Sequence, residues 1–137
     1  MPEAPSSVKI LYLCIGNACR SQMAEAWANF HSKGSVESHS AGMCPYGRIV
    51  DETYDVMLEK GVPMDGQCSK GLEDVSINDM SLVIRMGSEV GFIPPAGFKG
   101  RVLDWEIPDP YGCDLGTFRS VRDLIERRVL GLLRALE

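Results

Sequence analysis

Two residues near the start of this 137-residue chain have the types and spacing needed for covalent chemistry on an anion. Cys14 and Arg20 stand six positions apart, with Gly16 between them. A cysteine thiolate is a strong nucleophile, and the planar fork of an arginine can bind two oxygens of a tetrahedral oxyanion at once. A third residue, Asp109, lies far downstream between two prolines and could supply an acid.

The residues between Cys14 and Arg20 suit a loop that curls around an anion. Glycine and small residues let the backbone N–H groups face inward, and Asn17 tolerates the left-handed backbone angles of a tight turn. The positive field is expected to lower the pKa of Cys14 from about 8.5 into the range of about 3.5 to 7.5. Ser21 could donate a hydrogen bond to the sulfur. The 14–21 loop therefore predicts an oxyanion cradle with a nucleophile inside.

The elements around this loop predict an α/β fold. Residues 8–14 form an apolar run typical of a buried parallel strand, and helical spacing follows from residue 20 or 21 to about 32. The helix N-terminus then faces the loop, which favours anion binding. Further strands are expected at 36–40, 81–86 and 101–105, and helices at about 49–58 and 117–136, with a brief helical or irregular piece at 87–92.

Strands that alternate with helices predict a three-layer α/β/α architecture with a four-stranded parallel sheet. In such folds ligands bind at the carboxyl ends of the strands. Cys14 ends the first strand, Ser40 the second, and Asp109 follows the fourth, so these three are expected to meet at one edge.

Composition narrows the class of protein. The length fits one domain spanning 1–137, and no apolar run approaches the roughly 18 residues of a membrane span. The polar segment 1–7 is not signal-like and the cysteine count of five is odd, so a reduced, cytoplasmic protein is expected. A net charge of −5 argues against nucleic acid or a membrane as a partner. We expect neither a metal nor a cofactor.

Two motifs carry a family resemblance. Cys-x-Gly-Asn-x-Cys-Arg-Ser at 14–21 and the late Asp109-Pro110-Tyr111 together resemble the low-molecular-weight protein tyrosine phosphatases and the thioredoxin-linked arsenate reductases that share their fold. The resemblance spans nearly the whole chain, including 40–42 and 118–129. It implies that Cys14 attacks phosphorus, Arg20 stabilises the equatorial oxygens and Asp109 protonates the leaving group.

The resemblance also implies roles for neighbouring residues. Ser21 and Ser40, with Asn17, resemble the network that holds the loop, and Tyr111 resembles an aromatic wall of the pocket. Ile15 would form part of the floor or rim. The residues expected to bind the substrate are Ile15, Gly16, Asn17, Ala18, Cys19 and Tyr111.

We expect hydrolysis of phosphotyrosine-like aryl phosphates, on a protein or a small molecule, through a phosphocysteine. The alternative is an arsenate reductase in which Cys19 or an external thiol resolves the adduct on Cys14, and a third interpretation is a non-catalytic phosphate or phosphopeptide sensor. Asp109 argues against the sensor, because binding needs no proton donor. Related reductases carry two further cysteines after the third strand, but residues 85–95 contain none, although 67–70 resembles the reductase branch.

Some residues leave their roles open. Cys19 is either a packed small residue or, as the resemblance implies, a thiol that forms a reversible disulfide with Cys14. Arg85, in the third strand, either reaches the active edge or covers an end of the sheet. The remaining cysteines, Cys44, Cys68 and Cys113, and the histidines, His31 and His39, are expected to be bystanders.

Overall fold

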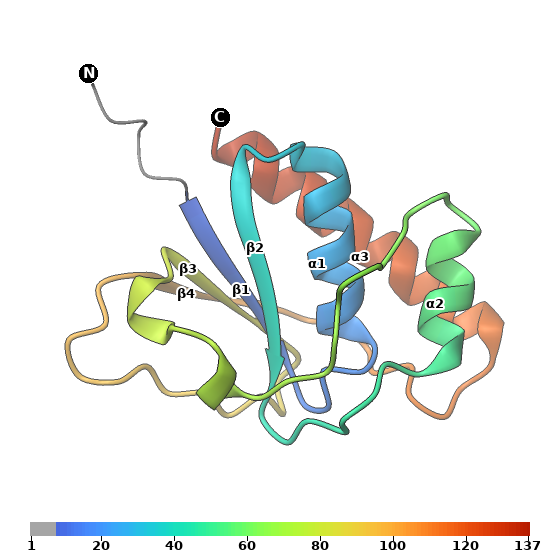
Figure 1. Ribbon diagram of the computed structural model, residues 1–137, viewed down its shortest axis with the longest axis horizontal. Coiled ribbons are helices and arrows are strands. Elements are labelled where there is room, and N and C mark those ends of the chain that lie inside the picture. Colours follow the sequence, from blue (N-terminus) through green and yellow to red (C-terminus); the bar gives the residue numbers. More distant parts are fainter. Residues whose placement is uncertain (1–7) are drawn as a thin grey trace.

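A computed structural model describes residues 8–137. The segment 1–7, which is not expected to be a signal peptide, lies outside the described residues. Four parallel strands form one sheet in the order β2-β1-β3-β4 (Figure 1). The strands are β1 (Val8–Cys14), β2 (Val36–Gly42), β3 (Leu82–Met86) and β4 (Arg101–Trp105). All four carboxyl ends therefore lie at the same edge, as the sequence predicts.

The strand β1 is central and pairs with β2 on one side and β3 on the other. Its middle residues, Ile10 to Leu13, are fully buried, because both faces of this strand are covered. This explains why the run is apolar at consecutive positions rather than at alternate ones. The strand thus delivers Cys14 to the sheet edge from a rigid base.

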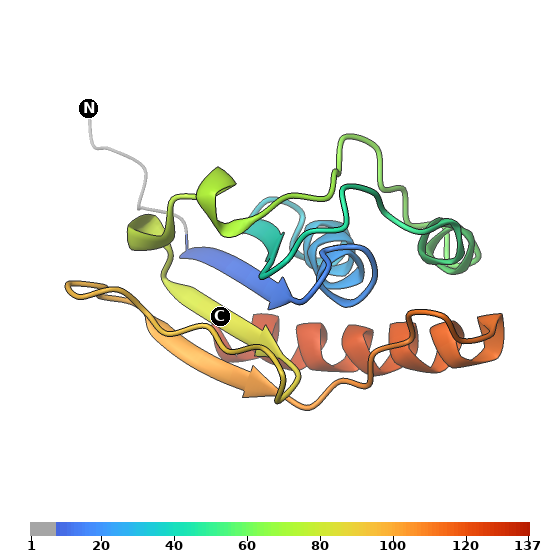
Figure 2. The same ribbon diagram turned by 90° about the horizontal axis from the view of Figure 1, so that it is seen from below.

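The helices α1 (Arg20–Ser32) and α3 (Leu115–Ala135) cover one face of the sheet, and α2 (Asp51–Leu58) packs against these two helices. They lie to the right of the strands in Figure 1, and Figure 2 shows α1 and α3 side by side. Trp27 of α1 is buried between these helices and its indole N–H donates to the carbonyl of Arg122, 3.1 Å away. This contact fixes α1, and with it the helix N-terminus behind the 14–21 loop.

The other face is covered by a thin layer of irregular chain. Two short 3-10 turns, η1 (Leu72–Asp74) and η2 (Ile77–Asp79), and the loop 87–98 supply it. Their apolar side chains pack with Leu11, Leu13 and Val83 of the sheet. The three-layer α/β arrangement is confirmed, with its third layer made of turns and loop segments.

Element boundaries differ slightly from those predicted. The strand β2 continues to Gly42, because its last residues still pair with β1. The helix α3 begins at Leu115, since the Asp114 carboxylate caps it by accepting from the N–H of Thr117 at 2.9 Å. Of the two forms left open for 87–92, helical or irregular, the structure has the irregular one. No helix within 8–137 is long and apolar enough to cross a membrane.

Arg85 covers the sheet and does not reach the active edge. Its guanidinium binds both carboxylate oxygens of Asp104 on β4, at 2.7 and 2.9 Å, and donates to the carbonyl of Phe92 at 2.8 Å. The arginine therefore ties β3, β4 and the 87–98 loop together. Of the two roles left open for it, the structural one is the one observed.

Candidate active site

A small pocket at the carboxyl edge of the sheet brings together the three residues that the sequence predicts to be catalytic. Cys14 comes from the end of β1, Arg20 from the first residue of α1, and Asp109 from the loop after β4. Cys14 and Arg20 are 2% exposed, so the sulfur and the guanidinium are shielded from bulk water. The lining residues are Cys14, Gly16, Ala18, Cys19, Arg20, Tyr46, Asp109 and Tyr111.

The carbonyl groups of the 14–21 loop are held from outside. The N–H groups of the segment 43–50 donate to the carbonyls of Cys14, Ile15, Gly16 and Ala18, at 2.8 to 3.3 Å. The Thr53 hydroxyl also donates to the Ala18 carbonyl at 2.9 Å. Segment 43–50 therefore fixes which way the peptide planes of the loop face.

The N–H groups of the same loop have no such partner. Within residues 8–137, no hydrogen bond runs from the backbone N–H groups of residues 15–19 to another protein group. Buried N–H groups without an acceptor are rare in proteins. Five consecutive free donors next to a helix N-terminus are a suitable cradle for an oxyanion, and oxyanion binding by this loop stays a prediction from the sequence.

The sulfur of Cys14 has one close polar neighbour. The Ser21 hydroxyl lies 2.8 Å from it and also accepts a hydrogen bond from the side-chain amide of Asn17 at 2.8 Å. Because the Asn17 donor occupies a lone pair of the hydroxyl, the serine proton is free to point at the sulfur. The serine hydroxyl is thus placed to donate a hydrogen bond to the sulfur, as the sequence predicts.

Asn17 holds the loop from beneath. Its backbone has a positive φ of 50°, and its side chain is fully buried. The amide oxygen accepts from the side chain of Gln22 and from the N–H of Lys70, both at 2.8 Å. Gln67 in turn donates to the Gln22 side chain at 2.8 Å. Sequence analysis missed both glutamines, since neither residue type signals a site.

Arg20 is bound on one side and turned toward the pocket on the other. Its Nη1 donates to the carbonyls of Met86 and Ile107, at 2.6 and 3.1 Å, and contacts Glu89 Oε1 at 2.6 Å. Its Nη2 lies 3.6 Å from Asp109 Oδ2. The carboxylate of Asp109 thus stands beside the arginine at the entrance, where it could exchange a proton with a bound oxyanion.

Two tyrosines wall the pocket. Tyr46 and Tyr111 meet edge to face with ring centroids 4.9 Å apart, and both remain well exposed. The ring of Tyr46 lies against Gly16 so closely that a Cβ at that position would collide with it. Tyr111 was expected here from the resemblance. Tyr46 was not predicted.

Two expected site residues lie away from the pocket. Ile15 packs on the loop-covered face of the sheet, against the apolar cluster of Leu11 and Leu13, because the chain turns there. Ser40 makes no hydrogen bond to the 14–21 loop. Its hydroxyl donates to Glu25 at 2.5 Å and accepts from the Lys70 ammonium at 3.4 Å. Ser40 therefore links β2 to these two side chains and not to the loop.

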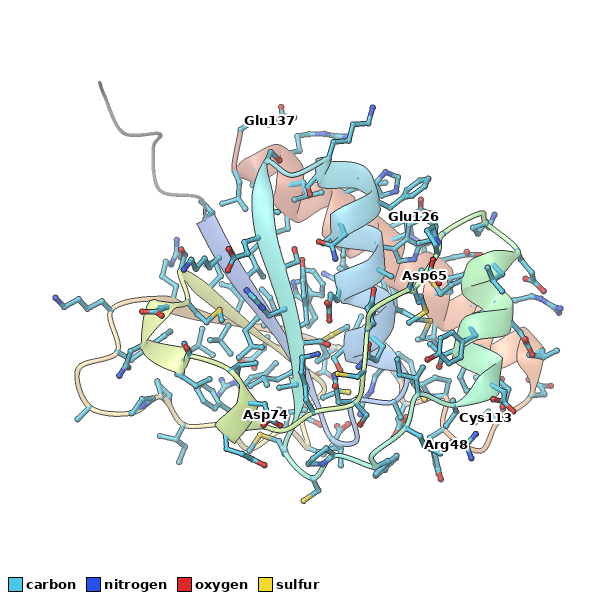
Figure 3. All side chains as sticks on the ribbon, viewed as in Figure 1. Arg48, Asp65, Asp74, Cys113, Glu126 and Glu137 are labelled. Atoms are coloured by element: carbon cyan, nitrogen blue, oxygen red, sulfur yellow. The ribbon has the colours of Figure 1, made fainter. Side chains whose placement is uncertain are left out.

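All five cysteines are free, and their surroundings differ. Cys19 lines the pocket but is only 4% exposed, and burial raises its pKa to about 12. Cys44, Cys68 and Cys113 are exposed, and none of them lines the pocket. Cys113 sits on the loop that leads into α3, at the lower right of Figure 3.

The fold and the site place the chain in a class of α/β enzymes that bind oxyanions. The profile of the low molecular weight phosphotyrosine protein phosphatases matches residues 9–137, and the chain belongs to this family. It is 32% identical over 126 residues to a glutaredoxin arsenate reductase of Synechocystis, covering 91% of this chain and 95% of that protein. It is 30% identical to the low molecular weight protein-tyrosine-phosphatase YfkJ of Bacillus subtilis, covering 95% of this chain and 96% of that protein.

The fold of this chain also matches solved structures of arsenate reductases. An arsenate reductase in the phosphate binding state superposes with a TM-score of 0.86 at 30% identity, over 95% of this chain and 99% of that one. This likeness agrees with the observed cradle in indicating an oxyanion site. The family thus includes relatives with two different named activities, arsenate reduction and protein tyrosine dephosphorylation.

Proposed function

We propose that this protein is an arsenate reductase that uses Cys14 as nucleophile and an external thiol to complete the reaction. The observation that carries the proposal is a buried cysteine and arginine in one pocket, joined by a loop whose backbone N–H groups at 15–19 have no acceptor in residues 8–137. The names of the Synechocystis relative and of the superposed structure support arsenate as the oxyanion.

The first step joins sulfur to arsenic. The Cys14 thiolate attacks arsenate, an S–As bond forms, and one oxygen leaves as hydroxide that Asp109 protonates to water. The loop N–H groups and Arg20 hold the remaining oxygens. Arsenic is still in its +5 state at this point.

The second step transfers the electrons. A second thiol attacks the sulfur of Cys14, an S–S bond forms, and the S–As bonding pair stays with arsenic, which leaves as arsenite in its +3 state. Another equivalent of thiol then reduces the mixed disulfide and returns Cys14 to its starting form.

Asp109 does not distinguish a reductase from a phosphatase. Hydroxide is the conjugate base of water, whose pKa is about 15.7, whereas the phenol of tyrosine has a pKa near 10. Expelling hydroxide from arsenate therefore needs a proton donor at least as much as expelling a phenoxide does. The acid serves either reaction.

The second thiol comes from outside the chain in this proposal. Cys19 is the one other cysteine lining the pocket, and with a pKa of about 12 it is almost wholly protonated near neutral pH. A protonated thiol is a weak nucleophile. The segment after β3 contains no cysteine and places Glu89 against Arg20 instead.

A second candidate function is hydrolysis of aryl phosphates such as phosphotyrosine. The pair of Tyr46 and Tyr111 favours it, since two rings in edge-to-face contact at the pocket mouth offer an apolar wall to an aromatic ring. The name of the YfkJ relative supports it as well.

A side-by-side assay separates the two functions. The purified protein would be given arsenate with glutathione or with thioredoxin, and in parallel an aryl phosphate, with Cys14→Ser as the inactive control and Cys113→Ser as the matched surface control. We expect arsenite release that needs added thiol and exceeds aryl phosphate turnover. Efficient ester hydrolysis with negligible arsenite release would overturn the proposal in favour of the second candidate.

We also propose where the enzyme works and how its chain is organised. A site built on a reduced cysteine needs a reducing compartment, so we propose that the enzyme works in the cytoplasm as a single domain spanning 1–137. Five free cysteines support this.

A further inference from the structure

Glu89 makes the shortest charged contact of the candidate active site, although it lies outside both sequence motifs. Its Oε1 is 2.6 Å from Nη1 of Arg20, and it comes from the irregular segment after β3. The glutamate side chain is 46% exposed, whereas that of Arg20 is 2% exposed. The glutamate therefore reaches inward from the surface to a buried cation.

The chain is shaped to permit this contact. Gly87 has a positive φ of 128°, and a Cβ there would lie 2.5 Å from Arg20 Nη1 and 2.6 Å from a carboxylate oxygen of Glu89. A side chain at this position would have to displace the end of Arg20 or of Glu89. Glycine at 87 thus lets the turn close over the arginine and present Glu89 to it.

Nη1 donates to two carbonyl oxygens, and the Glu89 carboxylate adds an ion pair to the same nitrogen at 2.6 Å. Glu89 and the carbonyls of Met86 and Ile107 surround this nitrogen, while Nη2 lies on the side of Asp109. A planar guanidinium held at one nitrogen can turn only about that anchor. The acceptors thereby decide which edge of the fork faces the Cys14 pocket.

We propose that Glu89 is a positioning residue, which anchors Nη1 of Arg20 so that the rest of the fork faces the oxyanion. It does not touch the substrate itself. Burial acts to raise the pKa of Glu89, but hydrogen bonds from its own backbone and from Arg20 outweigh burial and keep this pKa below its usual range. The carboxylate is thus charged while it holds the arginine.

The position of the contact also has an electrostatic consequence. Glu89 and Asp109 place two carboxylates on one guanidinium, so the field of Arg20 is partly neutralised before an oxyanion binds. A residue that merely competed with the oxyanion for Arg20 would weaken binding, whereas a positioning residue strengthens it. The two roles therefore predict opposite effects of removing the side chain.

The test uses inorganic phosphate as the probe and measures its binding by calorimetry. Glu89→Ala removes the anchor, Glu89→Gln keeps an acceptor oxygen without the charge, and Glu106→Ala is the matched control of an exposed acid in the same groove. We expect Glu89→Ala to weaken phosphate binding about tenfold. Glu89→Gln should stay within about threefold of the parent, and Glu106→Ala should match it.

A double-mutant cycle shows whether Glu89 acts through Arg20. In an Arg20→Lys background there is no fork to orient, so Glu89→Ala should change phosphate binding less than about twofold. Thermal unfolding of each variant checks that the fold is intact.

Three results would overturn the inference: unchanged or tighter phosphate binding by Glu89→Ala, an equal loss in Glu89→Gln, or a full loss in the Arg20→Lys background. The inference rests on the site of the proposed function but not on which reaction occurs there. Phosphate binding is measured without turnover, so a failure of the reductase proposal would leave the test of Glu89 intact.

Discussion

The 14–21 loop and the two segments that face it across the pocket are built in opposite ways. The loop is buried, and its carbonyls, Asn17 and Ser21 all have internal hydrogen-bond partners. The facing segments present Tyr46, Asp109 and Tyr111 with side chains largely exposed. Binding of the oxyanion is thus assigned to a fixed part of the molecule. Selection of the leaving group and of the second thiol is left to an accessible rim.

The largest effect should come from removing the nucleophile at the centre of the fixed loop. Cys14→Ser exchanges sulfur for a hydroxyl that stays protonated, so turnover of arsenate and of aryl phosphate should both vanish. Phosphate binding should persist, because the N–H cradle and Arg20 are untouched. Turnover and calorimetric titration measure the two properties separately, with Cys113→Ser as control. Residual turnover near the parent rate would exclude Cys14 as the nucleophile.

The next largest effect concerns the acid on the rim. Asp109→Asn should lower turnover by about 10²- to 10⁴-fold, since general acid catalysis contributes that much, while phosphate binding changes little. The loss should be larger for aryl phosphates with poor leaving groups than for activated ones. Asp65→Asn, at an exposed carboxylate, is the control. An equal loss across leaving groups would argue against proton donation.

A smaller effect is expected when the support beneath the loop is removed. Asn17→Ala deletes buried hydrogen bonds to Ser21, Gln22 and Lys70 and places alanine at a positive φ, so the free energy of unfolding should fall by about 2 kcal/mol. Turnover should fall with it, because the N–H groups lose their fixed directions. Urea unfolding measures the change, and Asn78→Ala, at an exposed site, should be neutral. A change below about 0.5 kcal/mol would show that this support is dispensable.

The smallest effect should appear at the aromatic rim. Tyr46→Ala is expected to raise KM for an aryl phosphate by about three- to tenfold, the loss of one aromatic contact, and to leave KM for arsenate nearly unchanged. Tyr54→Ala, an exposed tyrosine on α2, provides the matched control. A comparable rise for arsenate would mean that Tyr46 shapes the cradle and does more than wall its entrance.

The contrast between the two regions also explains what the sequence could predict. The buried strand, the 14–21 loop and the helix behind it depend on neighbouring residues, so hydrophobic pattern and spacing suffice to locate Cys14 and Arg20. The pairing of Arg20 with Glu89 joins residues that are distant in the chain, and nothing in the Gly-Ser-Glu-Val-Gly stretch signals it. Long-range side-chain partners of this kind require the fold.

Ser40 also shows that side-chain partners could not be predicted from the sequence, although its position in the strand could. Its place near the end of a strand at the active edge was predicted correctly, and yet its hydroxyl turns to Glu25 rather than to the loop. Strand position fixes the backbone, whereas the direction of a side chain depends on which polar partners the neighbouring segments bring. Tyr46 was missed for a related reason, since the shape of its loop is set by hydrogen bonds to Gly16 and Ser69.

The central claim is that Cys14 reacts with the oxyanion and that a thiol from outside the chain resolves the adduct. The most direct measurement is mass analysis of the protein after quenched turnover with arsenate and glutathione, with peptide mapping of each cysteine. The account predicts one glutathione joined to Cys14 by a disulfide, with Cys19 still a free thiol. A disulfide between Cys14 and Cys19 with no glutathione incorporated would contradict it.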